Sequence, residues 1–292
     1  MLLAFLYERG KLMDFYKNKK IVLLTKHKKE EVIRPIIEEA LGCTLLVESR
    51  FDTDKLGTFT REVKRPKSQL DTARLKISKG LRVSKESIGI SSEGSFGSHP
   101  FAPVQWNTEL VLFYDKLDNL EIFGIYEGPD TNCDERIVKS YEEAMEFSNR
   151  IGFPEHYVIM RPDHNKTKFI LKNIDTYEKL KDSYEKCLKK SKTQSVHIEA
   201  DMRAFANPTR MKNIQKATIN LVDKLNITCP ECGAPGFQVQ EIVRGLPCEM
   251  CGFPSEMAKA YVHTCHRCKY EYIEKNPKGM NSPAQYCERC NP

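Results

Sequence analysis

The chain has 292 residues, of which 40% are hydrophobic and 29% are charged. This balance excludes a mostly disordered chain and a protein built of membrane-spanning helices. The formal net charge is only +6, but residues 55–85 carry ten basic and two acidic residues, whereas residues 109–148 carry three basic and eleven acidic ones. A chain of this length accommodates a large domain and a small one, and we expect two domains.

The first twelve residues are predicted to be a non-native extension. Glu8-Arg9-Gly10-Lys11 can be encoded by a purine-rich, ribosome-binding-like stretch just ahead of Met13. We therefore expect the protein to start at Met13 and its first domain to span residues 13–226. The apolar run Leu2–Tyr7 is too short for a secretory signal and lacks a basic flank, so we expect a cytoplasmic location.

The chain begins with the pattern of a strand, a basic turn and a helix. Residues 21–25 form a short apolar run, and the turn Lys26–Lys29 follows it. Apolar residues at helical spacing then lead to Gly42, which is expected to end the helix. Pro35 lies in this pattern, so the helix either starts there or is kinked. Residues 45–47 predict a second strand.

Further elements alternate between helix and strand up to residue 225. Ser68 is expected to cap a helix over 69–79 that Gly80 ends, and a strand over 88–90 is expected to lead into a loop over 91–99. The remaining expected elements are a hairpin of residues 110–114 and 120–126, a helix over 140–150, strands near 157–160 and 168–172, a helix over 175–190, and a helix from Asn207-Pro208 to Leu225. This alternation predicts an α/β domain with a mixed sheet.

Eight of the eleven cysteines lie in four Cys-x-x-Cys pairs after residue 228. Fifteen residues separate the first two pairs and eighteen separate the last two, which is the spacing of four-cysteine zinc ribbons. The pattern predicts two structural zinc ions in a small domain over residues 227–292, with sequential or interleaved pairing of the ligands. The predicted ligands are Cys229, Cys232, Cys248, Cys251, Cys265, Cys268, Cys287 and Cys290.

The charge of this tail argues against nucleic acid as its partner. Residues 229–292 contain seven basic and seven acidic residues, and eight thiolates with two zinc ions bring the sum to about −4. Binding to nucleic acid depends on neutralising phosphates, which a tail of this charge does not do. A structural or protein-docking role fits better.

Polar segments before residue 228 predict a site for an anionic ligand. The turn after the first strand lies at a carboxyl strand end, where ligands bind in open α/β sheets. Glu93, beside a glycine, could hold Mg²⁺ or position a water. The candidate binding residues are Thr25, Lys26, Lys28, Lys76, Gly94, Ser95, Asp201, Arg203, Asn207 and Arg210, and the candidate catalytic residues are Glu93 and Asp71.

Residues 21–97 resemble the house-cleaning nucleoside triphosphate pyrophosphatase superfamily, which includes inosine triphosphatase-like and Maf-like proteins. The resemblance lies in Thr25-Lys26-His27-Lys28, Asp71-Thr72-Ala73 with Lys76, and Ser92-Glu93-Gly94-Ser95, and Asp201-Met202-Arg203 looks like the segment that contacts the base. It implies a mixed-sheet, three-layer α/β fold. The first turn lacks the superfamily's asparagine, and its adjacent acidic pair is reduced to Glu93.

Nearly the whole chain also resembles an uncharacterised bacterial family of unknown function with a C-terminal zinc ribbon. The motifs that carry this resemblance are Gly57–Thr60, Glu93–Gly97, Asp201–Met211, Arg244–Cys248 and Cys290–Pro292. No activity is assigned to this second family, so the resemblance does not indicate what the protein does.

The leading hypothesis is a Mg²⁺-dependent hydrolase of a nucleotide or related phosphorylated compound. Glu93 and Asp71 would place metal and water, while the lysines neutralise phosphate and Arg203 and Arg210 hold the far end of the substrate. The alternative is a non-catalytic nucleotide sensor or protein-docking adaptor. An RNA-associated factor is less well supported, because few aromatic residues accompany the basic segment 55–85.

Overall fold

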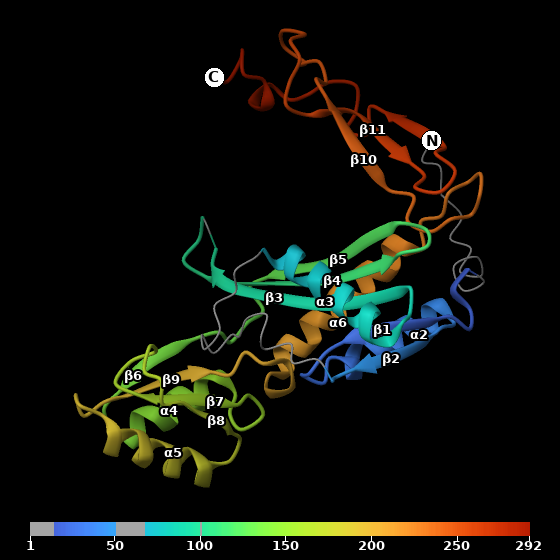
Figure 1. Ribbon diagram of the computed structural model, residues 1–292. Helices are drawn as coiled ribbons and strands as arrows, with labels where there is room; N and C mark the ends of the chain where they lie inside the picture. Colours follow the sequence, from blue (N-terminus) through green and yellow to red (C-terminus); the bar gives the residue numbers. More distant parts are fainter. Residues whose placement is uncertain (1–14, 51–67, 100) are drawn as a thin grey trace.

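The computed structural model describes residues 15–50, 68–99 and 101–292. The predicted extension at residues 1–12, the motif Gly57–Thr60 and the basic stretch 61–67 lie outside these residues. The described chain folds into a central five-stranded sheet, a four-stranded sheet and a cysteine-rich arm with three strands (Figure 1).

The central sheet has the strand order β2-β1-β3-β4-β5. Its first three strands pair in parallel, whereas β4 and β5 continue the sheet in antiparallel pairing. The predicted mixed sheet is therefore confirmed. The strand bounds are β1 Lys20–Leu24, β2 Thr44–Glu48, β3 Ile88–Ser98, β4 Gln105–Asp115 and β5 Leu120–Gly128.

Helices cover both faces of this sheet. Val111 and Phe113 of β4 share a core with α2 (Glu30–Leu41) and α6 (Pro208–Leu225), whereas Leu110 and Leu112 pack with α3 (Gln69–Ser84). Successive side chains of a strand point to opposite faces, so α3 lies on one face and α2 and α6 lie on the other. This part of the chain is thus a three-layer α/β unit.

The structure decides the position of Pro35 in one helix and moves the end of another. The first helix begins at Glu30, so Pro35 lies inside it, and it ends at Gly42 with a φ of 61°. The helix expected to stop at Gly80 continues to Ser84. Gly80 is buried against β1, where an added Cβ would lie 3.4 Å from Cγ1 of Val22. The missing side chain therefore brings helix and strand close together instead of ending the helix.

The predicted loop over residues 91–99 was wrong, because β3 continues through it to Ser98. Its glycines and serines have low strand propensity, but an unbroken ladder with β4 from Ile88–Asp115 to Ser98–Gln105 outweighs it. Glu93 therefore lies on a strand, which fixes the face of the sheet to which its side chain points.

The second sheet has the order β6-β9-β7-β8 and its own core. Its strands are β6 Glu135–Val138, β7 Val158–Pro162, β8 Leu171–Ile174 and β9 Val196–Ala200, and its helices are α4 Tyr141–Ile151 and α5 Tyr177–Lys190. The helices share one apolar core with alternate residues of the strands, including Val196 and Ile198. The sequence analysis had not predicted β6 and β9. The expected 13–226 domain thus contains two sheets with separate cores.

The cysteine-rich arm is built on the antiparallel strands β10 (Val239–Arg244), β11 (Ala258–Thr264) and β12 (Glu271–Lys275). Its small core contains Phe237, Cys229 and Cys265, and the arm extends away from the central sheet (Figure 1). Among the helices of the described residues, none has the length and apolar character needed to cross a membrane.

Candidate functional site

The eight cysteines of the arm gather in two clusters with interleaved pairing. The sulfur atoms within each cluster lie within 4.8 Å of one another, and several pairs lie 3.6–3.9 Å apart. Four sulfurs bound at about 2.3 Å to one tetrahedral zinc ion are about 3.8 Å apart, so each cluster could bind a zinc ion. The first cluster is Cys229, Cys232, Cys265 and Cys268, and the second is Cys248, Cys251, Cys287 and Cys290.

The antiparallel strands explain the interleaving. Each of the first three Cys-x-x-Cys turns is followed by a strand that carries the chain to the opposite end of the arm. The first and third turns therefore meet at one end, and the second and fourth meet at the other. The spacing of the cysteines alone is compatible with either sequential or interleaved pairing.

The turns have the local geometry of metal-binding knuckles. The N–H of Gly233 donates to the carbonyl of Cys229 at 2.9 Å, and the N–H of Gly252 donates to that of Cys248 at 2.9 Å. Both glycines have a φ near 70°, and Lys269 at the equivalent position of the third turn has a φ of 63°. In the second turn, backbone N–H groups lower the pKa of the Cys248 thiol to about 7, which favours the metal-binding thiolate.

A second candidate site lies where the strand order of the central sheet reverses. From β1 the chain crosses through α2 to β2 on one side, and then through α3 to β3 on the other side. The carboxyl end of β1 lies at this switch point, and such positions are where open α/β sheets bind ligands. β3 pairs with β1 only from Ile88 to Ile90, so residues 91–98 of β3 extend past the end of β1.

Lys29 lies at this switch point, beside the part of β3 that extends past β1. It is buried, and its ammonium donates to the carbonyl of Ser92 at 2.7 Å and to the hydroxyl of the same residue at 3.3 Å. Burial lowers its pKa from 10.5 to about 7, and the nearby cations Arg210 and Lys76 act in the same direction. The switch point thus holds a lysine whose charge is sensitive to any added anion.

Two ion pairs lie beside β3, one on each face of the sheet. Glu93 pairs with Lys76 of α3, while Nε of Arg210 donates to Glu109 Oε1 at 2.8 Å on the α6 side. A Cβ at Gly94 would overlap the Glu109 carboxylate, so this strand position requires glycine. Together with Lys29 these side chains form the switch-point cluster: three basic and two acidic residues, all but Lys76 buried.

Lys29 makes protein stability depend on pH. The unfolded chain keeps a proton on Lys29 up to pH 10.5, whereas the folded chain releases it near pH 7. The free energy of unfolding should therefore rise between pH 7 and 10.5, by up to about 1.4 kcal/mol per pH unit from this group. Urea unfolding of wild type and of Lys29→Met across this window measures the effect. Equal slopes in the two proteins would show that Lys29 titrates normally.

Three of the predicted site residues, Lys76, Glu93 and Arg210, belong to the switch-point cluster, and Gly94 lies against its Glu109 carboxylate. Thr25 lies at the end of β1 and is buried. Ser95 donates from its hydroxyl to Gln69 Oε1 at 3.3 Å, and Gln69 in turn donates to the Glu93 carbonyl at 2.8 Å, which links Ser95 to the backbone beside the cluster.

Arg203 and Asn207 lie outside the switch-point cluster, but contacts through other residues connect them to the turn after β1 or to the cluster. Arg203 is held by Asp201 at 2.9 Å and lies over the ring of Phe205, against which His27 stacks at 5.8 Å. His27 follows Lys26 in that turn. Asn207 caps α6, and its Oδ1 accepts from the N–H of Arg210 at 2.9 Å. It therefore positions Arg210.

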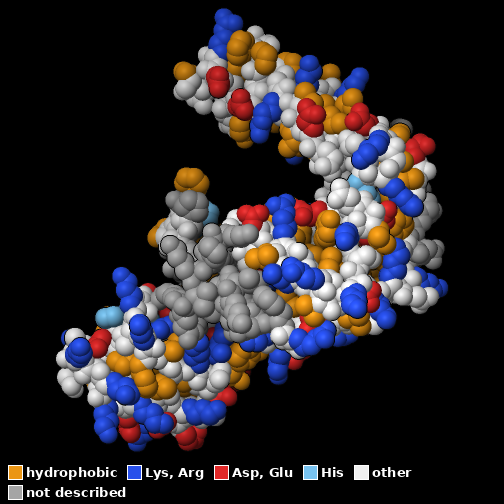
Figure 2. Space-filling view, viewed as in Figure 1, with side chains coloured by type: hydrophobic (Ala, Val, Ile, Leu, Met, Phe, Trp, Pro, Cys, Tyr) orange, Lys and Arg blue, Asp and Glu red, His pale blue; other side chains and the backbone are white. Residues whose placement is uncertain are grey.

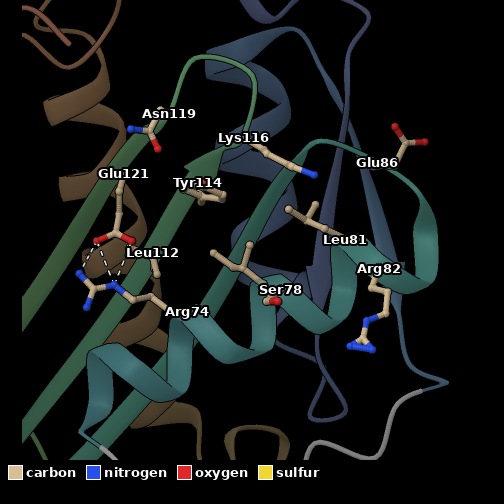
Figure 3. A pocket seen from close by; sticks show the side chains of 11 residues that line it. Arg74, Ser78, Leu81, Arg82, Glu86, Leu112, Tyr114, Lys116, Asn119 and Glu121 are labelled. Atoms are coloured by element: carbon tan, nitrogen blue, oxygen red, sulfur yellow. Dashed lines mark hydrogen bonds and ion pairs between the residues drawn. The ribbon is translucent and has the colours of Figure 1, made fainter.

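Asp71 and Lys28 have exposed partners outside the cluster. Lys28 lies 3.8 Å from Glu31. Asp71 accepts from Ser68 at the start of α3 and from Arg74 at 3.2 Å. Arg74 lines a separate groove of about 820 Å³ between α3 and strands β4 and β5, where Glu121 holds it (Figure 3). The contacts of Asp71 therefore connect it to this groove.

Sequence reasoning missed Glu109 and did not single out Lys29 as a site residue. A signal for Glu109 was present, since it occupies the same face of β4 as the core residues Val111 and Phe113. A charged residue in such an apolar alternation is buried only with a partner. Nothing in the sequence distinguishes Lys29 from the exposed Lys28, because the difference arises from where α2 meets β3.

Comparisons with known proteins identify one family. Residues 76–292 match a domain of unknown function, DUF6671, and this region includes both cysteine clusters, Glu93, Glu109 and Arg210. They show no link to the inosine triphosphatase-like proteins, and no protein of curated function matches the chain. Because the match spans well over half of its length, the chain belongs to the DUF6671 family.

Proposed function

We propose that the protein binds a small phosphorylated compound of the nucleotide class at the switch-point cluster. The observation that carries this proposal is the gathering of Lys29, Lys76 and Arg210 around the middle of β3, next to the carboxyl end of β1. A phosphate group brought beside Lys29 would favour its charged form and add a counter-charge to a cluster with more cations than carboxylates. The three-layer fold around β1 is compatible with the resemblance of residues 21–97 to inosine triphosphatase-like proteins.

Hydrolysis of that compound is the reaction that these residues suit best. The three cations would stabilise charge on the phosphate during in-line attack, and Glu93 would orient the water. Glu93 already pairs with Lys76, and Asp71 already contacts Ser68 and Arg74, so a Mg²⁺ ion would compete with these partners for both carboxylates. A Mg²⁺ ion would instead be held mainly by the phosphates of the ligand, as is usual for this metal.

A non-catalytic sensor that docks a protein through the arm is the second candidate. The buried Glu93–Lys76 pair favours it, because this pair would have to open before Glu93 could orient a water. The arm also exposes Met250 and Met280, whose side chains are 75% and 72% accessible. Acidic, basic and apolar side chains lie interspersed on the face of the arm seen in Figure 2, which suits a protein partner better than nucleic acid.

The two cysteine clusters are proposed to hold structural zinc. Four thiolates leave no open coordination position for a water or substrate, which is the arrangement of structural sites. Thiolates persist in reducing compartments, so we infer that the protein works in the cytoplasm.

Ligand binding is tested by thermal unfolding of the zinc-loaded protein with nucleoside mono-, di- and triphosphates, pyrophosphate and phosphate, each with and without Mg²⁺. A ligand at a hundred times its Kd should raise Tm by about 5–10 °C. Lys29→Met and Lys76→Met should lose this shift, whereas Lys189→Met on the exposed face of α5 should keep it. The proposal is wrong if no compound stabilises the wild type or if the three variants behave alike.

Release of phosphate or pyrophosphate separates the two candidates. A hydrolase should turn over the stabilising compound and lose turnover in Glu93→Gln, while a sensor should bind it unchanged. Full turnover by Glu93→Gln would contradict the catalytic role of Glu93.

A further inference from the structure

A third group of metal-ligating side chains lies on the four-stranded sheet, apart from the cysteines. Glu135 of β6 and His197 and Glu199 of β9 each offer one ligand atom, and these atoms lie within 4.8 Å of one another. Glu135 is directly opposite Glu199 in the β6–β9 ladder, and His197 is two residues before Glu199. All three side chains therefore project from the same face of the sheet.

This face is the one that α4 and α5 leave uncovered. Val196, Ile198 and Ala200 alternate with the two ligand residues of β9 and pack in the core beneath the helices. His197 and Glu199 are nevertheless buried, whereas Glu135 is partly exposed at the edge strand. Two potential ligands are thus shielded from solvent, and the third lies at the opening.

The charges of the group suit a cation. Like charges placed directly opposite each other on neighbouring strands are unfavourable, and Glu135 and Glu199 are placed in that way. Arg161 of β7 lies 3.7 Å from Glu199, which offsets one of the two carboxylates. A divalent cation between the carboxylates would reduce the repulsion between them and draw both toward itself.

The distances suit a metal ion as well. His197 Nε2 lies 3.4 Å from Glu135 Oε2. Donor atoms bound to one ion at about 2.1 Å are separated by roughly 3–4 Å, so small side-chain rotations would complete the site. Positions on paired strands are rigid, which keeps the cost of forming such a site low.

A cavity lies beside the group and provides room for further ligands. It has a volume of about 220 Å³, and Glu135, His197, His164 and Asn165 contribute to its lining. Asn165 donates to Glu135 Oε1 at 3.2 Å, which orients that carboxylate. The cavity is large enough for water molecules and brings a second imidazole, that of His164, to its wall.

We propose that Glu135, His197 and Glu199 bind a divalent first-row transition-metal ion, with water or His164 completing its coordination. One imidazole and two carboxylates are borderline-to-hard donors that suit Mn²⁺, Fe²⁺ or Zn²⁺, unlike the soft thiolates of the arm. The site is distinct from the switch-point cluster, so it does not depend on the function proposed for that cluster.

Mn²⁺ is the probe that separates this site from the cysteine clusters, because it binds thiolates weakly while zinc stays on them. The full chain, loaded with two equivalents of zinc that the eight thiolates bind, is titrated with Mn²⁺, and bound metal is followed by electron paramagnetic resonance. We expect one bound Mn²⁺ per chain and a nitrogen coupling from the imidazole of His197. His197→Gln should weaken binding at least about tenfold and remove the coupling from this imidazole, so that any nitrogen coupling that remains comes from His164.

Glu135→Gln is the second variant, because its partly exposed side chain can be changed with little effect on folding. It should also weaken Mn²⁺ binding about tenfold or more, with unchanged zinc content. Glu185→Gln, an exposed acid on α5 behind the sheet, should bind Mn²⁺ like the wild type. Absence of bound Mn²⁺ in the wild type, absence of a nitrogen coupling, or equal binding by Glu135→Gln and wild type would each overturn the proposal.

Discussion

Replacing Cys232 and Cys265 together by serine should remove one metal site and leave the other intact, whereas replacing Cys232 and Cys248 should remove both. The reason is the interleaved pairing, in which Cys232 shares a cluster with Cys265 and not with Cys248. Sequential pairing predicts the opposite result. Each structural zinc contributes on the order of 10 kcal/mol to folding of its site, so loss of both should unfold the arm.

Cobalt substitution measures this outcome. Only thiolate-bound cobalt gives an intense sulfur-to-metal charge-transfer absorption, so it reports the cysteine clusters and no oxygen or nitrogen site. The Cys232/Cys265 variant should keep half of the wild-type signal, and the Cys232/Cys248 variant should lose nearly all of it. Cys133→Ser, outside both clusters, is the control and should keep the full signal.

Replacing Arg210 by methionine should lower the free energy of unfolding by about 3–5 kcal/mol. Arg210 is among the largest fully buried side chains, and its guanidinium is bound to the fully buried carboxylate of Glu109. Removal of the cation leaves that carboxylate in a low-dielectric interior with Asn107 as a neutral donor at 3.2 Å. The paired replacement with Glu109→Gln removes the stranded charge and should recover most of the loss.

Urea unfolding followed by the fluorescence of Trp106 on β4 measures this effect, since it is the single tryptophan of the chain. Arg82→Met on the exposed side of α3 is the control and should change stability by less than about 0.5 kcal/mol. An Arg210→Met protein as stable as this control would show that the buried pair contributes little. A paired variant no more stable than Arg210→Met would show that packing, not charge, explains the loss.

The cysteine clusters and the Arg210–Glu109 pair could be predicted from the sequence to different degrees. The Cys-x-x-Cys spacing identified all eight cysteines of the two clusters, because each knuckle is a local turn whose geometry depends on adjacent residues. Most helices and strands were predicted close to their observed bounds for the same reason. Pairing of the knuckles depended on three strands alternating in direction, which no local pattern contains.

The burial and pairing of the charged residues in the central sheet depended even more on tertiary contacts than the pairing of the cysteine turns did. Lys28 and Lys29 are neighbours of the same type, yet one is exposed and the other is buried against Ser92 with its pKa lowered to about 7. Glu93 was expected in a loop, but pairing of β3 with β4 placed it on a strand facing Lys76. The sequence by itself determined the mixed α/β class, the eight cysteines of the two clusters and several members of the switch-point cluster. Tertiary structure decided which cysteines pair and which charges are buried together, because desolvation and strand pairing act between residues far apart in the chain.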